Sequence, residues 1–216
     1  KTAEIDTGQS VDFSVFEPHL AHELLQFLAP APEAVLVYRE HNQVGHEYLV
    51  TGEGELTPNT RWWFELTGAV VHFQSSVGLD HVRNALRIGM VASGRRVPPL
   101  RDAIKEAFGQ RVSVQSFAAM NRESEDESVH VLEVFPAGVD KWRGLSWIAQ
   151  QRGIDTARIA AIGDEVNDLA MLRAAGCGIA MGNAVDAAKD TARHVTEPNH
   201  QHGVASAIDR LLTGQW

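Results

Sequence analysis

The last third of the chain alternates short apolar runs with segments of helical character, and this rhythm constrains the fold most. Ile159 to Ile162 and Gly178 to Met181 are continuous apolar runs of strand length. Helices are predicted over Asn167 to Ala175 and Val185 to Ala192. Parallel neighbouring strands need a long, usually helical connection between them. We therefore predict an α/β fold with a doubly wound parallel sheet after Pro136.

The first two-thirds of the chain follows a different pattern. Helical spacing of leucines from Leu20 to Leu28 is followed by several strand-like segments in hairpin order, which is typical of an α+β domain. We predict a hairpin or linker over residues 1–16, an α+β domain over residues 17–135, and the parallel α/β part over residues 136–216.

An aromatic cluster interrupts the less regular stretch between residues 51 and 80. Trp62, Trp63 and Phe64 stand side by side in the sequence with Leu66 two positions on, and the four could form a short helix. We expect them chiefly to pack into the core, because aromatic side chains supply much buried area. The alternative is that they line a pocket.

Charge and cysteine content limit the possible partners and locations. The 216 residues include 28 acidic and 19 basic side chains, giving a net charge of −9, which argues against a nucleic-acid partner. No apolar run approaches the roughly 18 residues that a membrane-spanning helix requires. Cys177 is the single cysteine, which fits a reducing compartment, and we expect a cytoplasmic protein.

The turn from Gly163 to Asp168 carries the strongest indication of chemistry. It follows an apolar strand, at the edge of a parallel sheet where ligands bind. Asp164 and Asp168, four residues apart, can converge on one point suited to a hard cation such as Mg²⁺ beside a phosphate. The alternative is that Asp164 caps the following helix, which explains one acid but not Asn167 and Asp168 together.

A lysine stands where a helix is predicted to begin. Lys141 opens the segment Lys141 to Gln151, and a cation is unfavourable at the amino-terminal end of a helix dipole. A lysine in that position suits a phosphate ligand as a point charge. By itself this indication is weak, because most lysines are simply solvated.

Taken together, these residues resemble a known family. The segments 135–141 (FPAGVDK), 162–172 (IGDEVNDLAML) and 180–184 (AMGNA) are similar in order and spacing to motifs of the haloacid dehalogenase superfamily, most of all to its Cof-type phosphatases with a large α/β cap. The resemblance implies a Rossmann-like core, of which residues 136–216 would form the carboxy-terminal half, with residues 17–135 as the inserted cap.

The resemblance also implies an activity. Such enzymes are magnesium-dependent phosphatases of small phosphorylated metabolites, such as sugar phosphates, and they act through an aspartyl-phosphate. Lys141, Asn167 and Asp168 would be catalytic, Lys141 and Asn167 would contact the phosphate, and Asp164 and Asp168 would hold Mg²⁺. Asp168 would alternatively hold Lys141. Asp140 stands where the family often has serine, so the surroundings of Lys141 are expected to differ slightly.

One departure from the family pattern is large. The family's nucleophile lies in a DxDGT-type motif, and no such motif occurs in these 216 residues. We expect that motif to precede Lys1, the sheet to lack its first strands, and this chain alone to be inactive. The absence of an initiator methionine agrees with that expectation.

Two other functions remain open on the sequence. The chain could be a non-catalytic module that binds metal or phosphate without turnover. A phosphorylation domain of a P-type ATPase shares the GDxxND turn, but it would need flanking membrane helices, and an α+β insertion just before the lysine fits it poorly.

Overall fold

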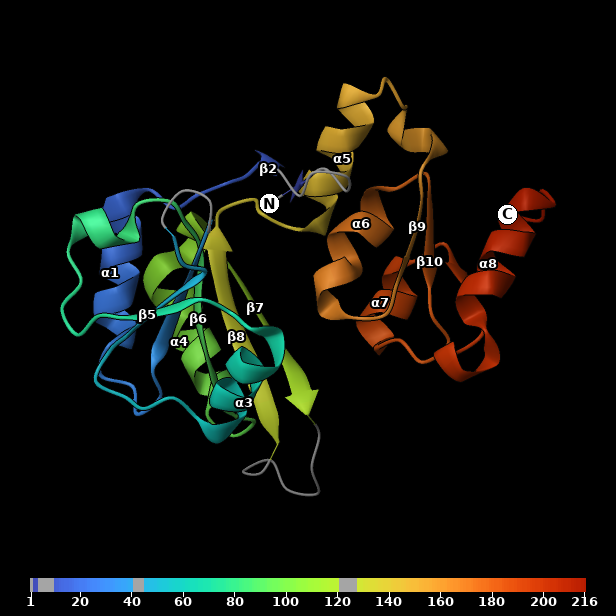
Figure 1. Cartoon of the computed structure of the whole chain (residues 1–216). Coiled ribbons are helices and arrows are strands. Elements are labelled where there is room, and N and C mark those ends of the chain that lie inside the picture. The colour runs from blue at the N-terminus through green and yellow to red at the C-terminus, as the bar shows by residue number, and fades with distance from the viewer. Residues whose placement is uncertain (1, 4–9, 41–44, 121–127) are drawn as a thin grey trace. The chain divides into compact units, whose positions relative to one another are not determined.

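The computed structural model describes residues 2–3, 10–40, 45–120 and 128–216, and the chain divides into two compact units (Figure 1). The first unit runs from Lys1 to Val139 and the second from Asp140 to Trp216. This division lies close to the boundary at residue 136 that the sequence predicts. Each unit is described below by itself.

A six-stranded sheet forms the first unit, in the order β5-β4-β3-β6-β8-β7. Its neighbouring strands are antiparallel except for the parallel pair β4 and β5. A short antiparallel pair, β1 with β2, precedes it. The turn of that predicted hairpin (residues 4–9) and most of the charged connection between β7 and β8 (residues 121–127) lie outside the described residues. The strands are β1 (Thr2–Ala3), β2 (Ser10–Asp12), β3 (Val35–Arg39), β4 (Tyr48–Thr51), β5 (Val71–Phe73), β6 (Ala85–Ser93), β7 (Val112–Met120) and β8 (Val129–Pro136).

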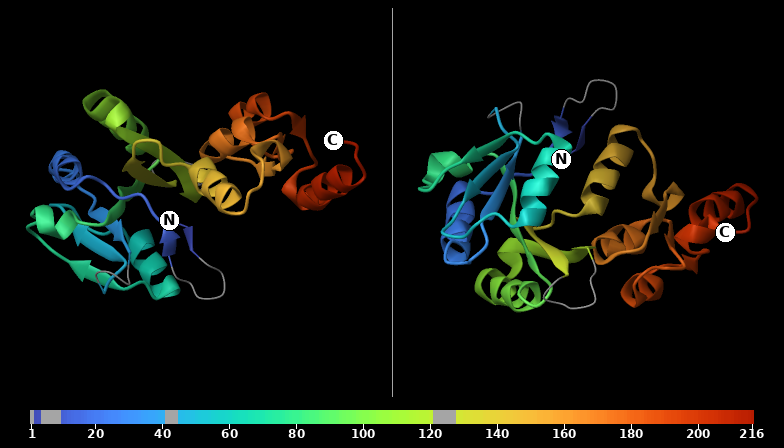
Figure 2. Two further views of the ribbon diagram at one scale, coloured as in Figure 1. Left: turned by 90° about the horizontal axis from the view of Figure 1, so that it is seen from above. Right: turned by 60° about the horizontal axis from the view of Figure 1, so that its bottom comes forward.

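Helices cover both faces of this sheet, as the left view of Figure 2 shows for α3 and α4. The helices of the unit are α1 (Pro18–Leu28), α3 (Pro58–Thr67) and α4 (Val97–Phe108), with short 3-10 turns η1 (Leu79–Val82) and η2 (Gly109–Arg111). Helices α1 and α4 pack on one face, where Leu24, Ile88, Ile104 and Leu132 are fully enclosed in the main core. The predicted leucine helix is therefore confirmed.

Helix α3 lies on the opposite face and corrects one prediction from the sequence. Phe64 is buried against the sheet with Val50, but Trp62 is 55% exposed and Trp63 is 49% exposed. Successive residues of a helix point about 100° apart, so three adjacent aromatic side chains cannot all face the same sheet. The expectation that the two tryptophans chiefly pack into the core is wrong.

The second unit is built on a three-stranded parallel sheet in the order β11-β10-β9. Its strands are β9 (Ala160–Gly163), β10 (Cys177–Ala180) and β11 (His194–Val195). Its helices are α5 (Lys141–Gln151), α6 (Leu169–Ala174), α7 (Asp186–Thr191) and α8 (Gly203–Leu212), with 3-10 turns η3 (Thr156–Arg158), η4 (Val166–Asp168) and η5 (Asn199–Gln201). Helices connect the parallel strands, so the predicted α/β character of this part is confirmed.

Two details of the second unit differ from the sequence expectations. The helix expected from Asn167 begins as the tighter turn η4, and regular α-helix starts at Leu169. Along α5, Ala149 is the buried residue, whereas Leu145 is 37% exposed although its apolar side chain would favour an inward position in the predicted helix. Within this unit α5 packs mainly on α6, which is too short to cover a whole face of a longer helix.

Within the described ranges, no helix has the length and apolar character that crossing a bilayer requires.

Candidate phosphate and metal site

The polar residues singled out from the sequence meet at the carboxyl end of β9. The Nζ atom of Lys141, at the start of α5, donates to Oδ1 of Asp168 at 2.5 Å and to Oδ1 of Asn167 at 3.2 Å. Asp164 follows β9 directly, and its backbone N–H donates to Oδ2 of Asp168. The structure therefore brings together three side chains and the backbone of Asp164 from two segments more than 20 residues apart in sequence.

Asp168 is the buried centre of this cluster. The residue is 3% exposed, and both of its carboxylate oxygens are engaged. Oδ1 accepts from Lys141, while Oδ2 accepts from the backbone N–H groups of Asp164 at 2.9 Å and Glu165 at 3.1 Å. A buried carboxylate requires such partners to offset its desolvation. Asp168 thus holds the turn in shape and holds the lysine at the same time.

Gly163 makes room for this carboxylate. A Cβ atom on Gly163 would lie 2.5 Å from Cβ of Asp168, much closer than a normal contact. The glycine is required here by close approach rather than by an unusual backbone angle. The sequence shows only the spacing, a glycine at the end of an apolar strand and an aspartate five residues later, and this spacing is the signal that could have pointed to the contact.

Asp164 differs from Asp168 in having its carboxylate free. The residue is half-buried, and among the described residues no hydrogen bond or ion pair reaches its side chain. Its backbone oxygen accepts from the N–H of Val185 at 3.0 Å, which ties the turn to the segment before α7. Glu165, not Asp164, is the residue that caps η4. The capping alternative for Asp164 is therefore wrong, and its carboxylate is available for another ligand.

Asp140 explains how a lysine is accommodated at the start of α5. Oδ1 of Asp140 accepts from the backbone N–H of Arg143 at 2.8 Å, as a helix N-cap does. A negative charge at this end offsets the unfavourable placement of the Lys141 cation. The Lys141 side chain keeps 50% of its surface exposed, so it can reach a ligand from outside. The capping role of Asp140 was missed in the sequence, where it stood out only as a departure from serine.

Magnesium fits part of this donor set. In the described part of the chain, no group of three or more His, Cys, Asp or Glu side chains is placed to share one metal ion. Mg²⁺ commonly binds through one or two carboxylates and fills its shell with water and substrate phosphate. The free carboxylate of Asp164 suits that role, whereas both carboxylate oxygens of Asp168 already accept hydrogen bonds from the protein.

Comparison with known proteins places this geometry in a family. The model of a haloacid dehalogenase-like hydrolase family matches residues 3–208. The chain belongs to this family. The resemblance seen in the sequence, including the Cof type, is thus confirmed.

Individual haloacid dehalogenase-like proteins agree with that assignment. Two proteins of Bacillus subtilis, both named 5-amino-6-(5-phospho-D-ribitylamino)uracil phosphatase, are similar to this chain. YwtE is 47% identical over 87 residues, covering 40% of this chain and 30% of YwtE. YitU is 38% identical over 117 residues, covering 54% of this chain and 40% of YitU. The matching regions therefore span less than half of these relatives.

A solved structure shows the same fold over nearly the whole chain. A haloacid dehalogenase-like hydrolase from Bacteroides thetaiotaomicron superimposes with a TM-score of 0.67 at 24% identity. The superposition covers 95% of this chain and 71% of that protein. At this identity the likeness establishes the fold and nothing finer.

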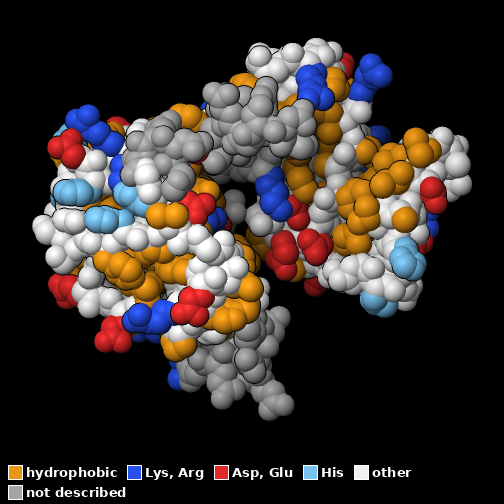
Figure 3. Space-filling model, in the orientation of Figure 1, with side chains coloured by type: hydrophobic (Ala, Val, Ile, Leu, Met, Phe, Trp, Pro, Cys, Tyr) orange, Lys and Arg blue, Asp and Glu red, His pale blue; other side chains and the backbone are white. Residues whose placement is uncertain are grey.

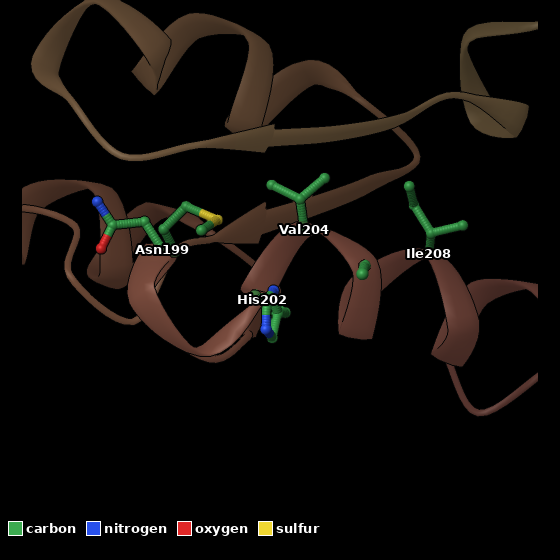
Figure 4. A pocket seen from close by; sticks show the side chains of 7 residues that line it. Asn199, His202, Val204 and Ile208 are labelled. Atoms are coloured by element: carbon green, nitrogen blue, oxygen red, sulfur yellow. The ribbon is translucent and has the colours of Figure 1, made fainter.

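A separate hollow of about 400 Å³ lies at the start of α8 and shares no residue with the cluster around Asp168. Val204 and Ile208 point to the same side of α8, and Asn199 and His202 lie near its amino-terminal end (Figure 4). No charged carboxylate, lysine or arginine lines it, so its chemistry does not favour a phosphate or a metal ion.

Proposed function

We propose that this chain forms part of a magnesium-dependent phosphatase that acts on a small phosphorylated metabolite. Lys141 and Asn167 contact the phosphoryl oxygens, Asp164 ligates Mg²⁺, and Asp168 positions Lys141. In this proposal residues 17–135 are the cap and residues 136–216 are the carboxy-terminal half of the Rossmann-like core. A cytoplasmic location remains a prediction.

One observation carries the proposal. A half-exposed ammonium group is held by Asp168 and Asn167, and the same turn carries the Asp164 carboxylate, which has no partner among the residues that the structure describes. Phosphoryl transfer needs positive charge near the phosphoryl oxygens, and a lysine fixed at Nζ supplies it without rearrangement. A bound Mg²⁺ would polarise the phosphoryl group and neutralise its charge.

The phosphoryl acceptor in this proposal is an aspartate outside the 216 residues, since no DxDGT-type motif occurs among them. Its carboxylate forms a bond to phosphorus, the P–O ester bond breaks, and a second acid protonates the departing alkoxide. Water then hydrolyses the aspartyl-phosphate. The contribution of Lys141 is to stabilise the charge on the phosphoryl oxygens in both steps.

Phosphorylated sugars and sugar alcohols are the substrate class that we propose. The two Bacillus relatives are named for a substrate with a phosphorylated ribityl group. The lysine, asparagine and aspartate cluster recognises a phosphate monoester rather than the rest of a substrate, so a panel of such esters is the right test.

The test is phosphate release by the full-length protein from a panel of sugar and polyol phosphates, with and without Mg²⁺. We expect Lys141→Ala to lower kcat by roughly 100-fold or more, as for loss of one preorganised donor. Lys189→Ala is the matched control, because Lys189 lies on α7 of the same unit outside the cluster. Asp164→Asn is expected to raise the Mg²⁺ concentration that gives half-maximal activity.

The rival function makes a different prediction. A non-catalytic module would bind Mg²⁺ and inorganic phosphate in calorimetry but release no phosphate from any ester of the panel. A folded full-length protein that stays inactive with Mg²⁺ would decide for this rival.

A further inference from the structure

A second and larger hollow lies on the first unit, between helix α3 and the face of the sheet that α1 and α4 leave uncovered. We call it the α3 hollow. Its volume is about 530 Å³, within the roughly 300–1,000 Å³ usual for small-molecule sites. On the face that Figure 3 shows, hydrophobic side chains gather on this unit with charged side chains beside them. Strands β3, β4, β6, β7 and β8 supply its floor, and α3 supplies a wall.

A glycine stands in the floor of the hollow. Gly89 on β6 pairs with Leu36 on one side and Glu133 on the other, so it stands in the middle of the sheet. Its neighbours on the same face, Arg87 and Val91, both carry side chains and both line the hollow. The absence of a side chain at Gly89 lets the β8 backbone approach β6 closely at this point. A Cβ atom at Gly89 would collide with the backbone oxygen of Leu132 at 2.0 Å.

The wall presents flat aromatic surfaces and one unused amide. Asn59, Trp62 and Trp63 lie at helical spacings of three and four residues, which places them on one side of α3. Both tryptophans line the hollow although they are about half exposed. The Asn59 side chain lines it too, and no described residue forms a hydrogen bond with it.

A set of polar side chains, already hydrogen-bonded to one another, lies at the floor of the hollow. Arg87 donates to the Glu133 carboxylate, and its Nη2 atom donates to the Tyr48 hydroxyl at 2.9 Å. Its guanidinium lies over the Tyr38 ring, 4.7 Å from the centroid. The Glu133 side chain is 13% exposed and the Arg87 side chain 32%. This group offers both donors and acceptors, but its two charges compensate each other.

We propose that the α3 hollow binds an uncharged, planar heteroaromatic ring. Tryptophan and tyrosine faces stack on flat rings, and ring nitrogen and carbonyl groups match the mixed donors and acceptors of Asn59, Arg87 and Glu133. A second phosphate is disfavoured because the arginine already faces a carboxylate. An aliphatic chain would cover the Asn59 amide without offering it a hydrogen bond. This inference does not depend on the proposed phosphatase activity.

The test measures binding of unphosphorylated probes to this chain by calorimetry and by saturation-transfer NMR. Adenosine, uridine and riboflavin offer rings of different size, ribitol lacks a ring, and 1-octanol offers an apolar chain. We expect saturable binding of at least one ring compound, with the strongest saturation transfer at its ring protons. Ribitol and 1-octanol are expected not to bind.

Variants of α3 locate the site. Trp62→Ala and Trp63→Ala are each expected to weaken ring binding at least about fivefold, the lower range for loss of one stacking partner. Leu66→Ala is the matched control, since Leu66 is 63% exposed on the same helix but does not line the hollow. Circular dichroism verifies that each variant is folded.

Three results would overturn the proposal. They are failure of all three rings to bind saturably, equal binding of 1-octanol or ribitol, and tryptophan variants that behave like Leu66→Ala. Binding of inorganic phosphate, measured in parallel, reports on the Lys141 cluster and separates failure of this proposal from failure of the proposed function.

Discussion

At the scale of single residues, two aspartates four positions apart have opposite surroundings. Asp168 is buried and accepts from a lysine and two backbone N–H groups, whereas the Asp164 carboxylate has no partner among the described residues. The carboxylate of Asp168 therefore stabilises the turn, whereas the carboxylate of Asp164 is available to bind a ligand.

We expect Asp168→Asn to lower the free energy of unfolding by about 1–3 kcal/mol, measured by urea denaturation. Asparagine keeps one acceptor oxygen but turns an NH₂ group toward donors, so a buried donor is left unsatisfied. Asp164→Asn is the matched control and should stay within about 0.5 kcal/mol of the wild type. Equal losses in the two variants would contradict this division of roles.

Glu133 gives a prediction of pH dependence. Burial raises the pKa of Glu133 above its ordinary value of 4.5, and Arg87 opposes that shift in part. A carboxyl group with a raised pKa binds protons more tightly in the folded state, so its contribution to stability is present below the unfolded pKa and is lost as pH rises. From about pH 4 to about pH 8, we expect the stability of Glu133→Gln to improve relative to the wild type.

The measurement is urea unfolding of both proteins across that pH range. Glu106→Gln, on the exposed side of α4, is the control and should follow the wild type throughout. Parallel stability curves for Glu133→Gln and the wild type would show that the raised pKa of Glu133 has no consequence for folding.

At the scale of elements, the first turn of α5 decides where the Lys141 ammonium group lies. The helix begins at Lys141, and Asp140 caps it through the Arg143 N–H. A frayed first turn would move the lysine away from Asp168. The cap is therefore a positioning device for Lys141 as well as a source of helix stability.

We expect Asp140→Ala to destabilise the protein by about 1 kcal/mol, the usual cost of losing an N-cap. It should also weaken binding of inorganic phosphate in calorimetry, because Lys141 loses its fixed position. Asp140→Ser, which retains a capping oxygen, should restore both properties. Loss of phosphate binding in Asp140→Ser as well would mean that the negative charge matters rather than the cap.

The turn after β9 is a second element with a strict requirement. A methyl group at position 163 would displace the Asp168 side chain, so we expect Gly163→Ala to cost about 1–3 kcal/mol, as overpacking does. Gly78→Ala is the control, because a methyl group there finds its nearest neighbour at 3.8 Å. Urea denaturation of the two variants compares the costs directly.

At the scale of the whole molecule, the two units differ in how much core they possess. The first unit encloses a cluster of large side chains between α1, α4 and the sheet, including Phe16, Leu24 and Ile88. The buried cluster of the second unit centres on Leu172 and Met181 and is otherwise made of alanines. Burial of large apolar side chains supplies most of the folding free energy.

We therefore expect residues 1–139 to unfold cooperatively in urea when expressed alone, as followed by circular dichroism. Residues 140–216 alone should unfold at a lower urea concentration or lack a cooperative transition, because small units with few large buried side chains are marginal. A more stable second fragment would contradict this estimate of the two cores.

The resemblance to the family could be recognised from short sequence motifs. The glycine, aspartates and lysine of the site follow a fixed spacing along the chain, so local pattern was enough to identify them. The helices α1, α4, α5 and α8 were also predictable, because each shows helical spacing and clear end signals such as proline at the start or glycine after the end.

The surroundings of individual side chains could not be predicted from the sequence, in contrast to the fold class and the family. The sequence by itself determined the α/β rhythm, the family and the identity of the polar cluster, because these depend on local spacing. The tertiary structure alone decided that Asp168 is saturated while Asp164 is free, and that Trp62 and Trp63 line a hollow instead of a core. Those properties depend on which distant groups meet each side chain, such as Lys141 at Asp168 and the β6–β8 face at α3, and local spacing carries no information about such contacts.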